Sequence, residues 1–300
     1  MIAYIGEIAA LGTALFWAVS ATNFTLAGKR IGALAVNRYR TLLGSCFLIT
    51  LHLILFQRAW PAATNKQLLL LLTSSVVGIV IGDSFLFKAY VNIGPRLSLL
   101  IFNANPIFTA LLALAFLGEK LKLMAWVGII ITLLGALWVI MEEHKNKASP
   151  RAGGLLRGIL FAVLAAFGQA AGYVLAKPVM IGNGGLPPLS ATLIRVLAAA
   201  LTLWIVAFAS GSASLISKDI KDKKAVSHTV IGSLFGAFLG IWFSLIALKY
   251  APAGIAATLI STLPIAMLPI AIFVFKEKIS WRAAIGAVIS VIGVAIIFNA

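Results

Sequence analysis

Ten long apolar runs limit what this chain can fold into. Each run holds about 20 mainly apolar residues, enough for a helix to cross a hydrocarbon core of roughly 30 Å. A helix bonds its own backbone N–H and C=O groups inside lipid, whereas a membrane β-barrel would alternate apolar and polar residues. We therefore predict an all-α, polytopic membrane protein with spans at 3–27, 34–56, 68–90, 97–117, 123–141, 155–177, 189–210, 229–249, 255–275 and 281–298.

The composition and the placement of charge agree with this class. Hydrophobic residues make up 62% of the chain and charged residues 11%, whereas soluble proteins carry about 25% charged residues. The net charge of +16 does not indicate nucleic acid, because the Lys and Arg residues lie almost entirely between the apolar runs. The first run lacks a basic leader, so we expect a retained span. The expected environment is the lipid bilayer of the cell (inner or plasma) membrane.

The sequence repeats itself. A shift of 158 positions, without a gap, places Pro106 on Pro264 and Glu119-Lys120 on Glu277-Lys278. We predict a first five-helix repeat at 1–141, a basic linker at 142–154 and a second five-helix repeat at 155–300. Five is odd, so the second repeat must enter the bilayer upside down, which is the inverted-repeat architecture of secondary transporters. The same shift aligns four glycine pairs: Gly78 with Gly236, Gly82 with Gly240, Gly128 with Gly286 and Gly135 with Gly293.

The two aligned prolines predict broken helices. Pro106 and Pro264 each stand near the middle of a span, where proline removes one backbone hydrogen bond and clashes with the carbonyl four residues earlier. Interrupted spans at corresponding positions of two repeats point to a transport site near the bilayer midplane. The alternative is a kink that serves packing alone.

Three stretches carry a family resemblance. "FWAVSATNF", "GDSFLFKAYVNIGPRLSLLIFNANPIFTALLALAFLGEKL" and the later "LKYAPAGIAATLISTLPIAMLPIAIFVFKEKI" resemble the EamA family of the drug/metabolite transporter superfamily. The resemblance implies ten helices in two EamA-type repeats, a central cavity between them, and export or exchange of small metabolites, amino acids or drugs. The chain departs from the family pattern at Lys276, where glycine is usual, and at Gly168, where the first repeat has Trp17.

Two acidic residues lie within spans. Asp83 has no acidic counterpart, since Ile241 occupies the matching position, and Glu7 stands close to the start of the first span. Acids inside a membrane are costly and typical of ion or proton pathways, so Asp83 and Glu7 are the candidate proton carriers. A structural ion pair is the alternative for Asp83, and surface anchoring is the alternative for Glu7.

Two arginines occupy mirrored positions. Arg40 is the seventh residue of the second span and Arg195 the seventh of the seventh span. In an inverted repeat they approach the centre from opposite faces, and either can hold an anionic group such as a carboxylate. The alternative is that both reach lipid phosphates. Further pathway candidates, which can instead bridge helices, are Asn103, Asn105, Ser261, Thr262, Asn23, Gln169 and Tyr173.

Enzyme signatures are missing from the sequence. It has no HExxH, GxSxG or P-loop motif, and its three histidines lack metal-ligand spacing. We expect no catalytic residue, metal or cofactor. The function predicted is secondary transport of a small-molecule substrate, an amino-acid-like or drug-like metabolite, most simply outward. A non-transporting scaffold or receptor component and an intramembrane enzyme are the alternatives, and the oligomeric state, monomer included, stays open.

An even number of spans places both termini on one side. Lys and Arg are concentrated near the odd-numbered connections, and the positive-inside rule then places the termini outside the cytoplasm. The family resemblance implies cytoplasmic termini instead. Both orientations stay open.

Overall fold

The computed structural model describes residues 4–142, 155–211, 221–273 and 280–300. Within these ranges ten helical stretches are long and apolar enough to cross a membrane, which confirms the predicted all-α class. Except for Glu142, the basic linker expected at 142–154 lies outside the described residues. Glu277 lies outside them as well.

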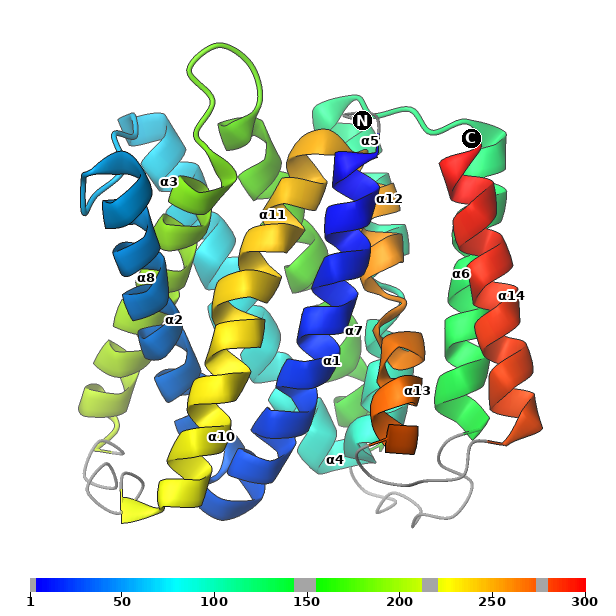
Figure 1. Ribbon diagram of the computed structural model, residues 1–300, viewed down its shortest axis with the longest axis horizontal. Helices are drawn as coiled ribbons and strands as arrows, with labels where there is room; N and C mark the ends of the chain where they lie inside the picture. Colours follow the sequence, from blue (N-terminus) through cyan, green and yellow to red (C-terminus); the bar gives the residue numbers. More distant parts are fainter. Residues whose placement is uncertain (1–3, 143–154, 212–220, 274–279) are drawn as a thin grey trace.

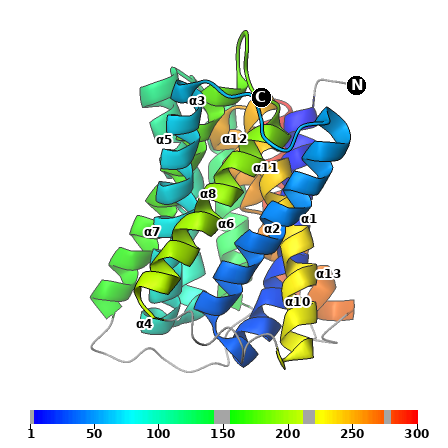
Figure 2. The same ribbon diagram turned by 90° about the vertical axis from the view of Figure 1, so that its left-hand side faces the viewer.

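The helices form one bundle (Figure 1). The first half comprises α1 (Ile5–Ile31), α2 (Ala33–Phe56), α3 (Asn65–Ser74), η1 (Ser75–Gly82), α4 (Asp83–Phe102), α5 (Asn105–Leu117) and α6 (Leu123–Glu142). The second half comprises α7 (Leu155–Ala176), η3 (Lys177–Met180), α8 (Pro188–Ala209), α10 (Lys223–Ser233), η5 (Leu234–Gly240), α11 (Ile241–Tyr250), α12 (Ala253–Ile260), α13 (Leu263–Phe273) and α14 (Trp281–Phe298). Helix α1 begins and α14 ends at the same end of the bundle (Figures 1 and 2), which we call the terminal end.

The contact between α6 and α14 shows how the halves are related. A Cβ atom added at Gly135 would lie 2.4 Å from Ser290 N, and one at Gly293 would lie 2.4 Å from Thr132 N. The Ser290 hydroxyl donates to the Thr132 carbonyl at 2.9 Å, across a separation of 158 residues. Residues equivalent in the two repeats therefore meet each other, and the helices run antiparallel. Such a reciprocal contact places a pseudo-two-fold axis across the helices, and the inverted repeat is confirmed.

Two spans are interrupted at matching places. The fourth span breaks at residues 103–104 and the ninth at 261–262. Pro106 is the second residue of α5 and Pro264 the second of α13. Proline suits the first turn of a helix because its missing N–H would have no intrahelical acceptor there. Each proline thus begins a new half-helix inside its span.

The third and eighth spans each contain a π-helical turn. These turns, η1 and η5, occupy positions that the 158-residue shift superposes to within one residue. π-Helical turns widen a helix locally and are frequent at functional sites. Asp83 directly follows η1, so the widened turn sets the direction in which its carboxylate points.

Glycines let η1 approach α7 closely. A Cβ atom added at Gly172 would lie 2.9 Å from the Cα of Gly78, and one at Gly168 would lie 3.3 Å from the Cα of Gly82. Small residues permit such backbone contact between helices in lipid. In the other repeat the matching glycine of η5, Gly240, instead packs against Trp17. These two equivalent contacts between the repeats therefore differ in how closely the helix backbones approach each other.

Candidate functional site

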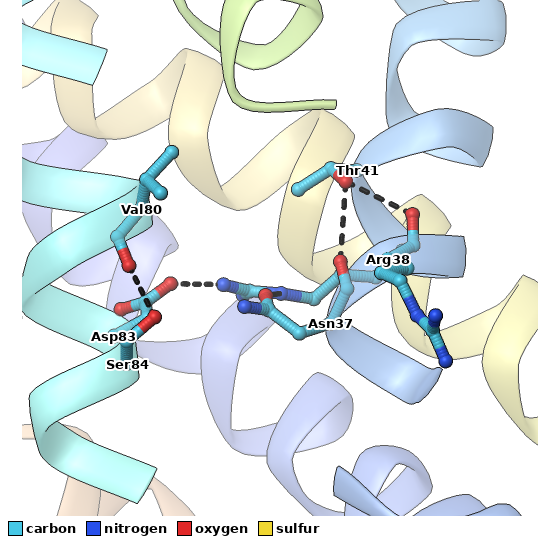
Figure 3. A network of polar contacts seen from close by, with 7 residues as sticks. Asn37, Arg38, Thr41, Val80, Asp83 and Ser84 are labelled. Carbon is cyan, nitrogen blue, oxygen red and sulfur yellow. Dashed lines mark hydrogen bonds and ion pairs between the residues drawn. The ribbon is translucent and has the colours of Figure 1, made fainter. Parts of the chain in front are cut away.

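An ion pair joins α2 to the helix that follows η1. The Arg40 guanidinium donates through Nη2 to Asp83 Oδ2, and Figure 3 shows the Asp83 carboxylate facing α2. The Arg40 side chain is 18% exposed and that of Asp83 is 21% exposed. A charge pair inside an apolar bundle is stable only with good geometry and further hydrogen bonds. The pair is therefore only partly buried in the bundle.

Neighbouring residues of α2 orient the arginine. Arg40 Nε donates to Asn37 Oδ1 at 2.7 Å, so Asn37 fixes the direction of the guanidinium. The Asn37 amide nitrogen is buried and has no hydrogen-bond partner among the described residues. Arg38 is buried as well and points away from Asp83 in Figure 3. Sequence reasoning missed Asn37, although its place three residues before Arg40, on the same helix face, was a usable signal.

The second arginine lies deep among the helices. Arg195 is 2% exposed, and its Nε and Nη1 atoms are buried without a hydrogen-bond partner within the described part of the chain. Its Nη2 lies 3.5 Å from where a Cβ atom of Gly78 would stand, so the guanidinium rests against η1. Lipid phosphates are therefore out of its reach in this structure.

Hydroxyl groups fasten η1 in front of this arginine. Ser75 Oγ donates to the Arg195 carbonyl at 2.6 Å, and Ser74 Oγ donates to the Gly172 carbonyl at 2.5 Å. Both serines are fully buried. They tie the widened turn to α8 and α7, which holds Gly78 and Asp83 at fixed places. Neither bond could be predicted from the sequence, because neither joins residues at equivalent positions of the two repeats.

Tyr173 shares the surroundings of Arg195. Its hydroxyl is buried, and the side chains of Gln169 and Ser244 lie beside it. Arg195, Gln169 and Asp83 all lie within electrostatic range of that hydroxyl. Asp83 interacts with Arg195 as well as with Arg40. The structure thus brings five of the predicted pathway residues together: Asp83, Arg40, Arg195, Gln169 and Tyr173.

The helix breaks place four more candidates inside the bundle. Asn103, Asn105, Ser261 and Thr262 are all buried. Asn105 Oδ1 accepts from Thr109 Oγ1 at 2.9 Å, and Thr262 Oγ1 donates to the Leu259 carbonyl at 2.7 Å. The Asn103 amide nitrogen is buried and unpartnered within the described ranges. Of these four, Asn103 is thus the one with a buried donor free for a ligand.

The remaining candidates lie elsewhere. Asn23 Oδ1 on α1 accepts from His228 Nδ1 on α10 at 3.0 Å, and the Asn23 amide nitrogen donates to the Val19 carbonyl. Glu7 lies in the first turn of α1, and its Oε2 atom is buried without a hydrogen-bond partner among the described residues. Neither Asn23 nor Glu7 is seen in contact with Asp83 within the described part of the chain, so a role for either residue in the pathway stays a prediction.

A second ion pair closes the terminal end. Glu119, in the turn after α5, pairs with Lys177, the first residue of η3. Glu119 Oε2 also accepts from the backbone N–H of Ala253, the first residue of α12, at 2.7 Å. Lys177 Nζ donates to the Ala251 carbonyl at 2.6 Å. The turn carries Gly118 at φ 67°, a left-handed conformation that glycine adopts without strain. Glu119 therefore serves as both salt-bridge partner and helix cap.

An inverted repeat with two broken spans and a polar centre defines a class, the multi-pass membrane transporters. The family model described as the EamA-like transporter family matches residues 4–141 and 156–299. The chain therefore belongs to the EamA family, within the drug/metabolite transporter superfamily.

Two individual proteins illustrate the relationship. An uncharacterized transporter of Bacillus subtilis (strain 168), YetK, is 23% identical over 263 residues, covering 86% of this chain and 76% of YetK. A solved crystal structure superposes with a TM-score of 0.78 at 15% identity, covering 97% of both chains. The crystal structure supports the fold, and the family match supports membrane transport.

Proposed function

We propose that this protein is a secondary transporter that exports small organic metabolites, amino-acid-like or drug-like, across the cell membrane. The observation that carries the proposal is the charged centre of Arg40, Asp83 and Arg195. Charged side chains inside a membrane bundle mark substrate or ion pathways. Here they come from both repeats and stand beside a π-helical turn.

The mirrored arginines support a site between the repeats. Arg40 is the eighth residue of α2 and Arg195 the eighth of α8. Helix α8 starts at the terminal end and α2 at the other end (Figure 1), so the guanidiniums approach the midplane from opposite directions. A substrate held between them would contact both repeats, which is the requirement for alternating access.

Buried apolar residues are distributed unevenly between the two ends of the bundle, which supports access to the centre from one end. The largest buried apolar cluster gathers residues from the terminal halves of the helices, including Ala9, Leu71 and Leu248. Among the residues whose side chains the structure describes, a smaller cluster at the opposite end contains Ala89, Ile93 and Ala162. The larger cluster and the Glu119–Lys177 pair support a conformation closed at the terminal end. We infer that the central cavity opens toward the opposite face.

Asp83 is the proposed proton carrier. Its carboxylate either pairs with Arg40 or binds a proton, and a switch between these two states would release the Arg40 guanidinium for substrate. Proton binding on one side of the membrane and release on the other would couple transport to the proton gradient.

Transport itself is tested with the purified protein in liposomes. The vesicles are loaded with a mixed panel of amino acids and other small metabolites, and each is followed by mass spectrometry with and without a pH gradient. We expect time-dependent efflux of at least one compound, faster with the gradient. Protein-free liposomes are the control. The complete absence of flux from folded, inserted protein would contradict the proposal and favour a scaffold.

A further inference from the structure

Five cations gather where α1 ends and α10 begins, at the end of the bundle opposite the terminal end (Figure 1). Lys29 and Arg30 stand in the last turn of α1, Lys221 precedes α10, and Lys223 and Lys224 are the first two residues of α10. All five residues are exposed. The two helices belong to different repeats and pack along each other. The cluster therefore spans the boundary between the repeats.

One described carboxylate lies in this cluster, and both of its oxygens are already engaged. Asp222 Oδ2 accepts from Arg30 Nε at 2.7 Å, and Asp222 Oδ1 accepts from the Ala225 backbone N–H at 3.0 Å. None of the four lysines is seen in an ion pair with an acidic group of the described residues. The cluster thus keeps an excess of positive charge that no described residue balances.

The cluster lies at the depth where lipid headgroups meet water. Arg30 is the next-to-last residue of the first membrane span, and Lys223 is the first residue of the eighth. Cations at the ends of spans stand beside the phosphates of the adjoining leaflet. Clusters of Lys and Arg at this depth attract anionic lipid headgroups.

Beyond its first two lysines, the exposed face of α10 is aliphatic. Val226 is 38% exposed and Ile231 is 40% exposed. Val226 follows Lys223 by three residues and Ile231 follows Lys224 by seven, and both spacings return to the same helix face. At about 1.5 Å per residue, Ile231 lies about 10 Å deeper in the membrane than Lys224. This face therefore offers cations at headgroup depth and aliphatic contact for an acyl chain beneath them.

The equivalent end of the other repeat lacks these lysines as a pair. The 158-residue shift superposes the start of α3 on the start of α10, with Thr64 capping α3 where Asp222 caps α10. Helix α3 begins with Asn65 and Lys66, whereas α10 begins with two lysines. The shared fold therefore uses a cap at this position and does not require the second lysine beside it.

We propose that this cluster and the adjoining face of α10 form a docking site for an anionic phospholipid. The headgroup phosphate lies between the lysines of α10 and the cations of α1, and one acyl chain follows α10 over Val226 and Ile231. The lipid bridges the two repeats beside the Arg30–Asp222 ion pair. A soluble polyanion fits less well, because the charged site continues into an aliphatic face at membrane depth. The inference goes beyond the transport function and does not depend on it.

Lipid binding is measured on the full-length protein in a neutral detergent. Native mass spectrometry counts the lipid retained during titration with phosphatidylglycerol or with phosphatidylcholine of the same acyl chains. Thermal unfolding is followed in parallel. We expect phosphatidylglycerol to be retained at lower concentration and to raise the unfolding temperature more, and added salt to weaken this preference. Equal binding of the two lipids would overturn the site.

Inorganic phosphate separates a lipid site from a site for soluble anions. We expect phosphate alone to stabilise the protein less than phosphatidylglycerol does, because it makes no contact with the aliphatic face of α10. Equal stabilisation by phosphate and by the lipid would overturn the assignment to a phospholipid.

Three double variants assign the effect to residues. Lys223→Gln with Lys224→Gln should weaken phosphatidylglycerol binding about tenfold or more, since two charges that attract the phosphate are lost. Lys223→Arg with Lys224→Arg keeps both charges and should bind as the parent does. Arg58→Gln with Lys66→Gln is the matched control, because it removes two exposed charges elsewhere, one of them at the repeat equivalent of Lys224.

The control variant distinguishes a site from a general attraction by net charge. We expect it to keep the parent's preference for phosphatidylglycerol. An equal loss of preference in the control and in the lysine-to-glutamine variant of α10 would show that net charge alone attracts the lipid, and would overturn the site. An unchanged preference in the lysine-to-glutamine variant would overturn it as well. The unfolding temperature of each variant without added lipid is the control for folding.

Discussion

The Glu119–Lys177 pair at the terminal end and the Arg40–Asp83 pair near the centre use the same chemistry in different surroundings. At the terminal end each group has a second partner, since Glu119 caps α12 and Lys177 donates to the Ala251 carbonyl. At the centre Arg40 has Asn37 as a second partner, but Arg195 beside it lacks acceptors for two nitrogens in the described part of the chain. A fully paired cluster holds a structure in one state, whereas an incompletely paired cluster leaves capacity for a ligand. We therefore propose that the first cluster serves stability and the second serves transport.

The largest effect is expected from Asp83→Asn. The amide keeps the size of the side chain and removes its charge, so Arg40 loses its counter-ion and the proton carrier is gone. Export from cells should fall about tenfold or more, as loss of a charged hydrogen bond predicts, and residual export should no longer vary between about pH 5 and pH 8. Membrane insertion, followed by a fluorescent fusion, is the control. Normal export with normal pH dependence would remove Asp83 from the mechanism.

Glu119→Gln should lower the stability of the protein and leave transport by the folded molecules nearly unchanged, which is the opposite of the result expected for Asp83→Asn. Breaking a buried pair leaves Lys177 without its counter-ion, and the unfolding free energy should fall by roughly 3 kcal/mol. Transport per folded molecule should stay within about twofold of the parent, an energetic change below 0.5 kcal/mol. A transport loss larger than the loss of folded protein would show that the terminal pair takes part in the transport cycle.

Comparing Glu119→Ala with Glu119→Gln separates the two roles of this residue. Glutamine can still accept from the Ala253 N–H, whereas alanine cannot. We expect alanine to cost about 1 kcal/mol more in unfolding free energy, the typical contribution of a helix cap. Equal losses would mean that only the ion pair matters.

Hydropathy and proline chemistry act locally, which is why the ten spans and their breaks could be predicted from the sequence. The repeat could be predicted because its two copies keep identical residues at a constant spacing of 158 positions. The pairing of Arg40 with Asp83 depends on how α2 meets the third span, and no local pattern encodes it. The π-helical turns were likewise not predicted, because Ser75–Gly82 is as apolar as any neighbouring stretch. The Ser290–Thr132 contact was within reach, since its separation equals the repeat shift of 158 residues. An inverted repeat must bring some equivalent residues together at its axis.

A double-mutant cycle measures the central pair directly. Arg40→Gln and Asp83→Asn should each lower the unfolding free energy, and the double variant should lose about 1–2 kcal/mol less than their sum, as expected for residues in contact. Thermal unfolding in nanodiscs supplies the four values. Additive losses would show that the ion pair contributes nothing to folding.

The smallest effect on stability is expected at the exposed ion pair of Arg30 and Asp222, which serves as a reference for the Glu119–Lys177 and Arg40–Asp83 pairs. Arg30 Nε contacts Asp222 Oδ2 at 2.7 Å, and Asp222 caps α10 by accepting from the Ala225 N–H. That backbone hydrogen bond, followed by the Arg30 interaction, lowers the pKa of the Asp222 carboxyl below its ordinary value of 3.8. Its stabilisation is present above pH 3.8 and is lost as the pH falls through the lowered pKa.

Asp222→Asn should therefore lower the unfolding temperature least among these variants. The gap between parent and variant should be constant near neutral pH and close in acid. A gap that widens in acid would contradict this assignment of the cap.

The most direct test of the account compares the parent, Asp83→Asn and Glu119→Gln side by side in proteoliposomes, with flux normalised to folded protein. The account predicts that Asp83→Asn loses flux while staying folded, and that Glu119→Gln loses thermal stability while each folded molecule still transports. The reverse pattern, or equal loss of flux in both variants, would contradict the account, in which transport depends on the central charged residues and stability on the Glu119–Lys177 pair.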